Sequence, residues 1–287
     1  MDWENVTYEV RDHVAHVTMN RPETLNTLTA AMIKDIDEAM RTADRDSDVR
    51  VIVFTGAGRA FSSGHDLSGR PREAPPPGAP RPGSVEHRFD FEEEYYLEAN
   101  LTIRNLRTPT IAGLRGHVVL GGLMTALMCD LVVAEESTNL WNPSLRHVGT
   151  GGEIMVLPWE IGVRKTKLHL WTGDPIDVYE AERMGMVAKV VKDGTLEAEC
   201  RRLADRIALM PPRVVSMTKR SLNKLQEIQG QLLAYEHHFL MHQLGHASDE
   251  AAEWNARAAE KRNEGGFKAW LEFRDGPFRE QAQREYR

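Results

Sequence analysis

Hydrophobic and polar residues alternate in two short runs near the amino terminus. These runs are residues 7–10 and 14–19, and the polar residues Arg11-Asp12-His13 separate them. Such a pattern is typical of a β-hairpin. The next segment, residues 27–43, has apolar residues at four-residue spacing, which predicts an amphipathic helix with one buried face. The apolar residues at this spacing are Leu28, Met32, Ile36 and Met40.

Further along the chain, short apolar runs predict buried strands between helical segments. The expected strands are residues 51–56, 110–114, 131–134 and 187–191. Helices are expected over residues 88–106 and 177–184. After Gly194 the pattern is helical throughout, and the expected helices are residues 196–209, 212–229, 232–246 and 249–262.

The segment 116–130 is largely apolar and contains a glycine pair, Gly121-Gly122. It follows the predicted strand 110–114, so we expect the glycine amides at the amino terminus of a buried helix. Unpaired N–H groups and the helix dipole favour negative charge there. Glycine also lets a ligand oxygen approach the backbone closely. A glycine pair that serves only close packing of helix and strand would give the same pattern.

A second glycine-containing motif, Phe61-Ser62-Ser63-Gly64-His65-Asp66-Leu67, follows the predicted strand 51–56. Together with Arg21-Pro22-Glu23-Thr24-Leu25-Asn26 and the segment 116–130, it resembles the crotonase (enoyl-CoA hydratase/isomerase) superfamily. The resemblance extends from about residue 5 to Phe278. It implies an α/β fold in which a crotonase-like spiral of ββα repeats spans residues 1–194. It also implies a helical C-terminal trimerisation region over residues 195–287.

The resemblance further implies an enzyme that acts on an acyl-CoA thioester and stabilises an enolate through two backbone amides. In this chain those amides belong to His65 and Gly121. Coenzyme A is expected as part of the substrate, with no other cofactor. The residues implied to contact the substrate or its CoA part are Leu25, Ala60, Ser62, Ser63, Asp66, Leu67, Ser68, Gly122 and Trp141.

Both glutamates that transfer protons in the hydratase branch are absent. Met124, three residues after the oxyanion glycine, and Ser144 occupy their positions. Methionine cannot transfer protons, and serine has no useful pKa near neutrality without an adjacent base. Glu153, on the loop after Ser144, is the candidate replacement, because some isomerase branches place a carboxylate on this loop. It could instead cap the helix that follows, and Glu160 is a weaker candidate for the acid–base role.

Three functional hypotheses therefore stay open. In the first, Glu153 supplies acid–base catalysis in an isomerase, a decarboxylase or an atypical hydratase. In the second, the enzyme hydrolyses a thioester or a carbon–carbon bond, which requires a histidine and a carboxylate that converge on the pocket. His65, whose imidazole is free to enter the pocket, and His147 are the histidines to test. In the third, the protein binds acyl-CoA without turnover.

The segment 70–84 is rich in proline, which lacks an N–H donor and disfavours regular structure. We therefore expect a loop over residues 69–86. Because this loop follows the first oxyanion segment, we predict that it is a mobile lid over the acyl pocket. A surface excursion without function would have the same composition.

Composition and charge argue against several other classes of protein. The 287-residue chain has a net charge of −7 with acidic and basic residues mixed, so no nucleic-acid partner is expected. No apolar run approaches the roughly 20 residues of a membrane span, and the first residues lack the features of a signal peptide. Two cysteines offer no disulfide framework, which favours a cytoplasmic location.

Four histidines occur on the predicted helix 232–246. His238, His242 and His246 have i, i+4, i+8 spacing, and His237 is adjacent. Histidines at this spacing can bind zinc, but no Glu or Cys completes an obvious set. We therefore expect no metal site and interpret these histidines as solvated or interface residues. The family resemblance implies an interface, because it predicts a homotrimer or a dimer of trimers.

Overall fold

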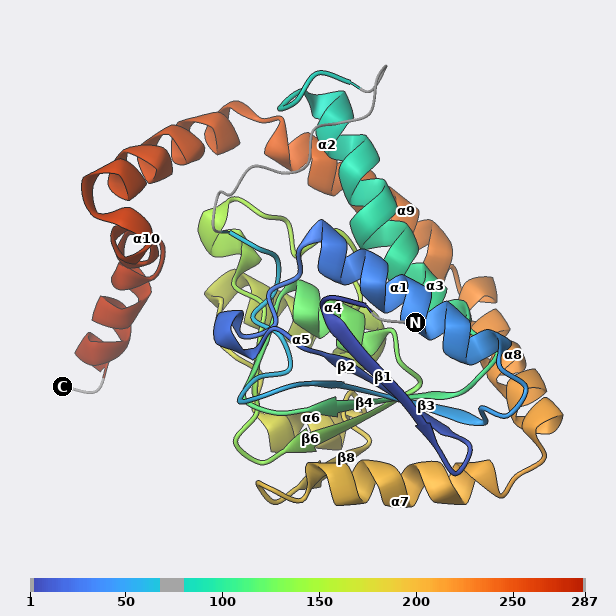
Figure 1. The fold of residues 1–287 in the computed structure, drawn as a ribbon. Helices are drawn as coiled ribbons and strands as arrows, with labels where there is room; N and C mark the ends of the chain where they lie inside the picture. The colour runs from blue at the N-terminus through green and yellow to red at the C-terminus, as the bar shows by residue number, and fades with distance from the viewer. Residues whose placement is uncertain (1–2, 68–79, 286–287) are drawn as a thin grey trace.

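A computed structural model of the protein describes residues 3–67 and 80–285 (Figure 1). Its strands are β1 (Val6–Arg11), β2 (Val14–Met19), β3 (Val51–Gly56), β4 (Thr110–Leu114), β5 (His117–Val119), β6 (Leu131–Glu135), β7 (Asn139–Trp141) and β8 (Lys189–Val191). Its α-helices are α1 (Ala30–Arg45), α2 (Val85–Glu92), α3 (Ala99–Asn105), α4 (Gly121–Leu127), α5 (Leu157–Thr172), α6 (Val178–Met184), α7 (Leu196–Ala208), α8 (Pro212–Ile228), α9 (Gln231–His246) and α10 (Asp249–Glu285). Shorter helical segments are η1 (Pro22–Thr24), the π-helix η2 (Glu93–Glu98) and η3 (Ser144–His147).

The strands form two sheets. The larger sheet has the order β1-β2-β3-β4-β6-β8. Its first two strands are the expected antiparallel hairpin, and all other neighbours are parallel. Strands β5 and β7 form a small parallel sheet. The units β1–β2–α1, β4–β5–α4 and β6–β7–α5 repeat one ββα order, so the predicted spiral of ββα repeats is confirmed.

Helices cover both faces of the larger sheet (Figure 1). On one face lies α7, whose Leu196, Cys200 and Ala204 are buried with Val53 and Ile111 of the strands. The opposite face carries the larger apolar cluster, which includes residues of α1 and α4. Helix α7 therefore packs on the sheet although it follows residue 194. The division of the chain at that residue stays a prediction.

The helix expected over residues 88–106 is a continuous run of α2, η2 and α3. It begins at Val85, because Ser84 Oγ accepts a hydrogen bond from the amide of His87 and caps the helix. The expected loop 69–86 therefore ends at Ser84. Residues 68–79 lie outside the described part of the chain, and the lid hypothesis stays a prediction. The π-helical turns of η2 lie in the middle of the run, and such turns are frequent at functional sites.

The carboxyl-terminal region is helical, as expected. Helices α8 and α9 lie on the same side of the molecule, whereas α10 extends to the opposite side (Figure 1). Helix α10 is interrupted at Gly265 and Gly266, which have non-helical dihedral angles. Its second half returns to pack beside η3, close to the carboxyl end of β7.

Candidate active site

The two predicted oxyanion amides lie on neighbouring segments. The amide of Val119, at the end of β5, donates to Ser62 O at 3.0 Å, which holds the segment after β3 against β5. Gly64 follows with φ of +89°, and a Cβ at this position would lie 2.8 Å from Val119 O and 3.6 Å from the Gly121 nitrogen. Only glycine fits this approach and this backbone conformation. Neither the His65 nor the Gly121 amide donates a hydrogen bond to any residue that the structure describes.

The imidazole of His65 lies at this pair of amides. A Cβ built on Gly121 would lie 2.6 Å from His65 Cδ2, so the ring occupies the space beside the glycine. The ring stacks on Tyr96 of η2, with centroids 3.8 Å apart and planes 10° apart. Its Nδ1 atom lies 3.5 Å from Glu153 Oε1. The imidazole of His65 therefore enters the site and faces a carboxylate.

Glu153 does not cap the helix that follows it. Helix α5 begins at Leu157, and no side chain caps its amino terminus. The carboxylate of Glu153 is instead buried, and its Oε2 atom has no hydrogen-bond partner within the described residues. Glycines before it allow this position, because Gly152 has φ of +104° and packs against Met124. One buried oxygen of Glu153 thus has no hydrogen-bond partner within the part of the chain that the structure describes.

The two positions without glutamate are both buried. Met124, on α4, packs its thioether under Gly152, since a Cβ there would lie 2.6 Å from Met124 Sδ. Ser144 begins η3, and its Oγ atom is a buried group without a hydrogen-bond partner among the described residues. Neither side chain replaces a carboxylate. The structure instead brings the buried carboxylate of Glu153 to 3.5 Å from His65 Nδ1.

Asn26 is a buried residue that bonds to several of the residues predicted to contact CoA. The sequence alone gave it no role of its own. Asn26 Nδ2 donates to the carbonyl oxygens of Ala57 and Ala60, each at 2.9 Å. Ser62 Oγ donates to Asn26 O at 2.8 Å, and Ser63 N donates to Leu25 O at 2.9 Å. These bonds fix the backbone that leads to His65.

Other predicted contact residues lie around the same segment. Gly122 packs against Ser62, since a Cβ on it would lie 2.7 Å from Ser62 Cβ. Asp66 donates its amide to Leu28 O, and the Leu67 carbonyl accepts a hydrogen bond from Arg262 of α10. Ser68 lies outside the described residues. The contacts of all these residues with CoA stay predictions.

Trp141 and His147 lie apart from His65 and Glu153. The backbone of Trp141 pairs with Val119, but its indole Nε1 donates to Gly173 O at 2.6 Å and its ring lies under the guanidinium groups of Arg146 and Arg274. The ring of His147 lies beside the rings of Trp254 and Trp270 of α10. Burial, followed by the charge of Arg274, lowers the pKa of His147 to about 4. Of the two candidate histidines, only His65 meets a carboxylate.

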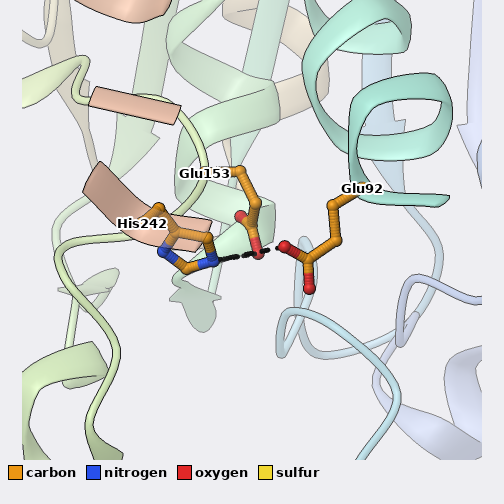
Figure 2. Close-up of side chains that lie close together, drawn as sticks. All are labelled: Glu92, Glu153 and His242. Carbon is orange, nitrogen blue, oxygen red and sulfur yellow. Dashed lines mark ion pairs between the residues drawn. The ribbon is translucent and has the colours of Figure 1, made fainter. Parts of the chain in front are cut away.

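Glu92 and His242 join the site although the sequence reading gave neither a role there. Glu92 ends α2, His242 lies on α9, and both point toward Glu153 (Figure 2). His242 Nε2 lies 3.4 Å from Glu92 Oε2 and 3.8 Å from Glu153 Oε1. The interpretation of His242 as a solvated or interface residue is wrong, because only 3% of it is exposed. Apolar periodicity could not place it, since the buried face of α9 includes polar residues and several of its large apolar residues are exposed.

The histidines of α9 do not converge on one point. His238 Nε2 bonds the carbonyl of Gly152 at 2.9 Å, whereas the Nε2 atom of His242 faces the carboxylates. A different set, Glu92, Glu153 and His242, has ligand atoms within 4.8 Å of one another and could hold a metal ion. Within the set, His242 Nε2 faces both carboxylates, and Gln243 Nε2 donates a hydrogen bond to Glu92 Oε2. That these three residues bind no metal ion stays a prediction.

Comparison with known proteins identifies the family of the chain. The family described as Enoyl-CoA hydratase/isomerase matches residues 9–281 of the chain. The Mycobacterium tuberculosis protein EchA13, whose name assigns it provisionally as an enoyl-CoA hydratase, is 38% identical over 260 residues, covering 86% of this chain and 82% of its own. The (E)-benzylidenesuccinyl-CoA hydratase of Thauera aromatica is 32% identical over 281 residues, covering 96% of this chain and 98% of its own.

Solved structures of the same kind of protein resemble this chain in fold. A probable enoyl-CoA hydratase from Mycobacterium smegmatis superimposes with a TM-score of 0.79 at 35% identity, covering 85% of this chain and 95% of the other. An enoyl-CoA hydratase/isomerase from Xanthobacter autotrophicus Py2 superimposes with a TM-score of 0.82 at 31% identity, covering 96% and 99%. The chain belongs to the enoyl-CoA hydratase/isomerase family, which is the crotonase superfamily. It is an enzyme of this type that acts on acyl-CoA thioesters.

Within residues 3–67 and 80–285, no helix combines the length and the apolar character that crossing a membrane requires.

Proposed function

We propose that the protein transfers protons at the α-carbon of an enoyl-CoA, as a hydratase or isomerase in which Glu153 and His65 replace the two absent glutamates. The observation that carries this proposal is the approach of the Glu153 carboxylate to the His65 imidazole, at 3.5 Å, beside the Gly121 amide. The thioester oxygen binds the amides of His65 and Gly121. Two such donors stabilise the negative charge that develops on this oxygen, and each contributes about 3–4 kcal/mol.

In the hydration reaction, one group removes a proton from water while the oxygen attacks the β-carbon. The electron pair of the double bond moves onto the thioester and forms an enolate at the two amides. A second group then delivers a proton to the α-carbon, so that one water molecule is added in total. Glu153, with its buried unpartnered Oε2, and the His65 imidazole supply these two groups. For isomerisation, Glu153 alone moves one proton between two carbons of the same substrate.

Turnover of crotonyl-CoA and cinnamoyl-CoA by the purified protein tests this proposal. The aryl substrate is included because aromatic side chains adjoin His65 and because the Thauera aromatica relative is named for a benzylidene substrate. We expect Glu153→Gln to lower kcat/KM by about 10²–10⁴-fold. Glu160→Gln tests the weaker acid–base candidate, a half-buried acid on the adjacent helix α5, and should leave kcat/KM nearly unchanged if Glu153 carries the role. Met124→Glu tests whether a carboxylate restored at the hydratase position takes over the reaction.

Thioester hydrolysis is a second candidate, because a histidine and a carboxylate do converge at the oxyanion amides. The two reactions differ in their products. Hydration removes the enoyl absorbance without releasing a thiol, whereas hydrolysis releases free CoA that reacts with a thiol reagent. Full turnover by Glu153→Gln would refute both assignments. Binding of acyl-CoA without turnover by the wild-type protein would favour the third hypothesis, a binding protein.

We also propose that the protein assembles as a homotrimer or a dimer of trimers. Support comes from large apolar side chains that are exposed along α8, α9 and the end of α7, since exposed apolar surface of this extent marks interfaces. These side chains are Leu209, Met210, Val214, Met217, Leu222, Leu225, Ile228, Leu233, Leu240, Met241 and Leu244. Light scattering should show that Leu225→Lys dissociates the assembly and that Val163→Lys, an exposed apolar position on α5, does not.

We also propose that the protein is located in the cytoplasm. Both cysteines, Cys129 and Cys200, are buried free thiols, as expected in a reducing compartment.

A further inference from the structure

Glu153 lies between two imidazoles rather than beside one. His65 Nδ1 approaches its Oε1 atom at 3.5 Å from one side, and His242 Nε2 approaches the same atom at 3.8 Å from another. The second oxygen, Oε2, is buried without a partner among the described residues. The carboxylate is therefore held through one oxygen, and the other is left for the substrate.

Behind His242 lies a second acid, Glu92. Its Oε2 atom is 3.4 Å from His242 Nε2 and accepts a hydrogen bond from Gln243 Nε2 at 2.7 Å. Burial raises the pKa of Glu92, but the hydrogen bond and charge of His242, with the hydrogen bond of Gln243, outweigh it and leave the pKa below its usual value. Glu92 is therefore a carboxylate at neutral pH, and it provides a counter-charge for His242.

The imidazole of His242 has polar neighbours at both nitrogens. Its Nδ1 atom lies 3.0 Å from Thr150 Oγ1, and its Nε2 atom faces the two carboxylates (Figure 2). The Nε2 atom lies at ion-pair distance from both carboxylates and makes no hydrogen bond within the described residues. Its side chain is 4% exposed, and those of Glu153 and Glu92 are 6% and 10% exposed, so water screens their charges only weakly.

Two other basic side chains near the cluster do not supply a positive charge to its carboxylates. The ring of His246 lies 4.5 Å from that of His242, but burial, followed by the charge of His242, lowers the pKa of His246 to about 4, so it is neutral near pH 7. Arg88 donates to the backbone carbonyl of His246 rather than to a carboxylate of the cluster. Among the described residues, two basic side chains lie at ion-pair distance from Glu153, those of His65 and His242.

We propose that Glu92 and His242 are positioning residues for Glu153: Glu92 orients His242, and His242 holds the Glu153 side chain directed toward His65. The set Glu92–His242–Glu153 is called the relay below. Neither Glu92 nor His242 touches the substrate in this role. The proposal rests on the proposed function, because it assumes that Glu153 is the acid–base group.

The pH profile of kcat/KM for the enoyl-CoA that turns over tests the relay. Glu92→Gln removes a negative charge that lies 3.4 Å from His242 Nε2, and this change disfavours an imidazolium beside Glu153. We expect the acidic limb of the profile to move up by about one pH unit, the lower end of the effect of a close opposite charge. His242→Gln should move it in the same direction, and the double variant should move it no further than His242→Gln. KM should change little, since neither residue contacts substrate.

Matched controls separate this effect from general damage. Glu94→Gln and His237→Gln change exposed residues of the same two helical segments and should leave the profile unchanged. Glu92→Asp keeps the charge and should restore much of the wild-type profile. A second readout needs no turnover: in histidine-ring NMR spectra, Glu92→Gln should lower the pH at which His242 is protonated.

Two outcomes would overturn the relay. If Glu92→Gln and His242→Gln lower thermal stability but leave both the pH profile and the His242 titration unchanged, the three residues only tie α2 to α9. If a chelator abolishes activity and Zn²⁺ restores it, the cluster is a metal site instead. Failure of the proposed function looks different, because Glu153→Gln would then retain full turnover whatever the state of His242.

Discussion

The contact between His65 and Gly121 makes a quantitative prediction. A Cβ added by Gly121→Ala would lie 2.6 Å from His65 Cδ2, which is closer than side-chain atoms tolerate, so the imidazole must move. If the imidazole moves, it loses its stacking on Tyr96, and this loss destabilises the folded protein by about 0.5–1.5 kcal/mol. Overpacking of this kind costs about 1–3 kcal/mol, and alanine in place of glycine in a helix recovers up to about 1 kcal/mol. We therefore expect Gly121→Ala to destabilise the protein by about 1–2 kcal/mol.

The clash depends on the imidazole, so a double-mutant cycle isolates it. In the His65→Ala background, Gly121→Ala should cost almost nothing or stabilise, which gives a coupling energy of about 1–2 kcal/mol. Denaturant unfolding of the four proteins at one protein concentration measures this energy. Activity should fall by about 10²–10⁴-fold in Gly121→Ala, because the displaced imidazole no longer faces Glu153.

Gly122→Ala provides the contrast. A Cβ there would lie 2.9 Å from the backbone oxygen of Ser62 and 2.7 Å from its Cβ, and neither atom is the end of a flexible side chain. Its cost should be the same with His65 or with Ala at position 65. If Gly121→Ala also costs the same in both backgrounds, within about 0.3–0.5 kcal/mol, the imidazole does not lie against Gly121 and the proposed acid–base pair is wrong.

Three further predictions concern buried polar groups. Asn26→Ala should lower the free energy of unfolding by at least about 2 kcal/mol, because the carbonyls of Ala57 and Ala60 lose their donor; a change below about 0.5 kcal/mol in urea unfolding would contradict this. Burial lowers the pKa of His238 to about 4. Below about pH 6.5 the unfolded chain therefore binds a proton that the folded protein does not bind. The free energy of unfolding consequently decreases as the pH falls from 6.5 to about 4. His238→Gln should flatten that loss in melting curves, whereas the exposed His237→Gln should not. Burial raises the pKa of Glu160 to about 7, so stability is lost as the pH rises from about 4.5 to 7, and Glu160→Gln should raise Tm at pH 8 but hardly at pH 4.

The local sequence was enough to place most elements. The alternation near the amino terminus gave the β1–β2 hairpin, and the four-residue spacing gave α1, because these periods follow directly from strand and helix geometry. The π-helix η2 was not foreseen. Its bonding pattern leaves no distinct mark in the spacing of apolar residues, and the run 88–106 has the appearance of an ordinary helix.

The two glycine motifs likewise identified the family, and they predicted an oxyanion role for the amides of His65 and Gly121. A backbone that must approach a ligand closely needs glycine at fixed positions, and that need is visible in the sequence. The absence of both hydratase glutamates was visible in the same way, at Met124 and Ser144.

What the sequence by itself determined is therefore the fold and the class of enzyme, and its oxyanion segments stay predictions. Only the tertiary structure decided which side chains supply the acid–base groups. Glu153 could have capped α5, and His242 could have faced solvent; each choice depends on the packing of α2, α9 and the Glu153 loop, which are separated by more than fifty residues of chain. Periodicity reports which face of one element is apolar. It does not report which buried polar group on that element meets a carboxylate from another, because that meeting is fixed by the contacts of the whole fold.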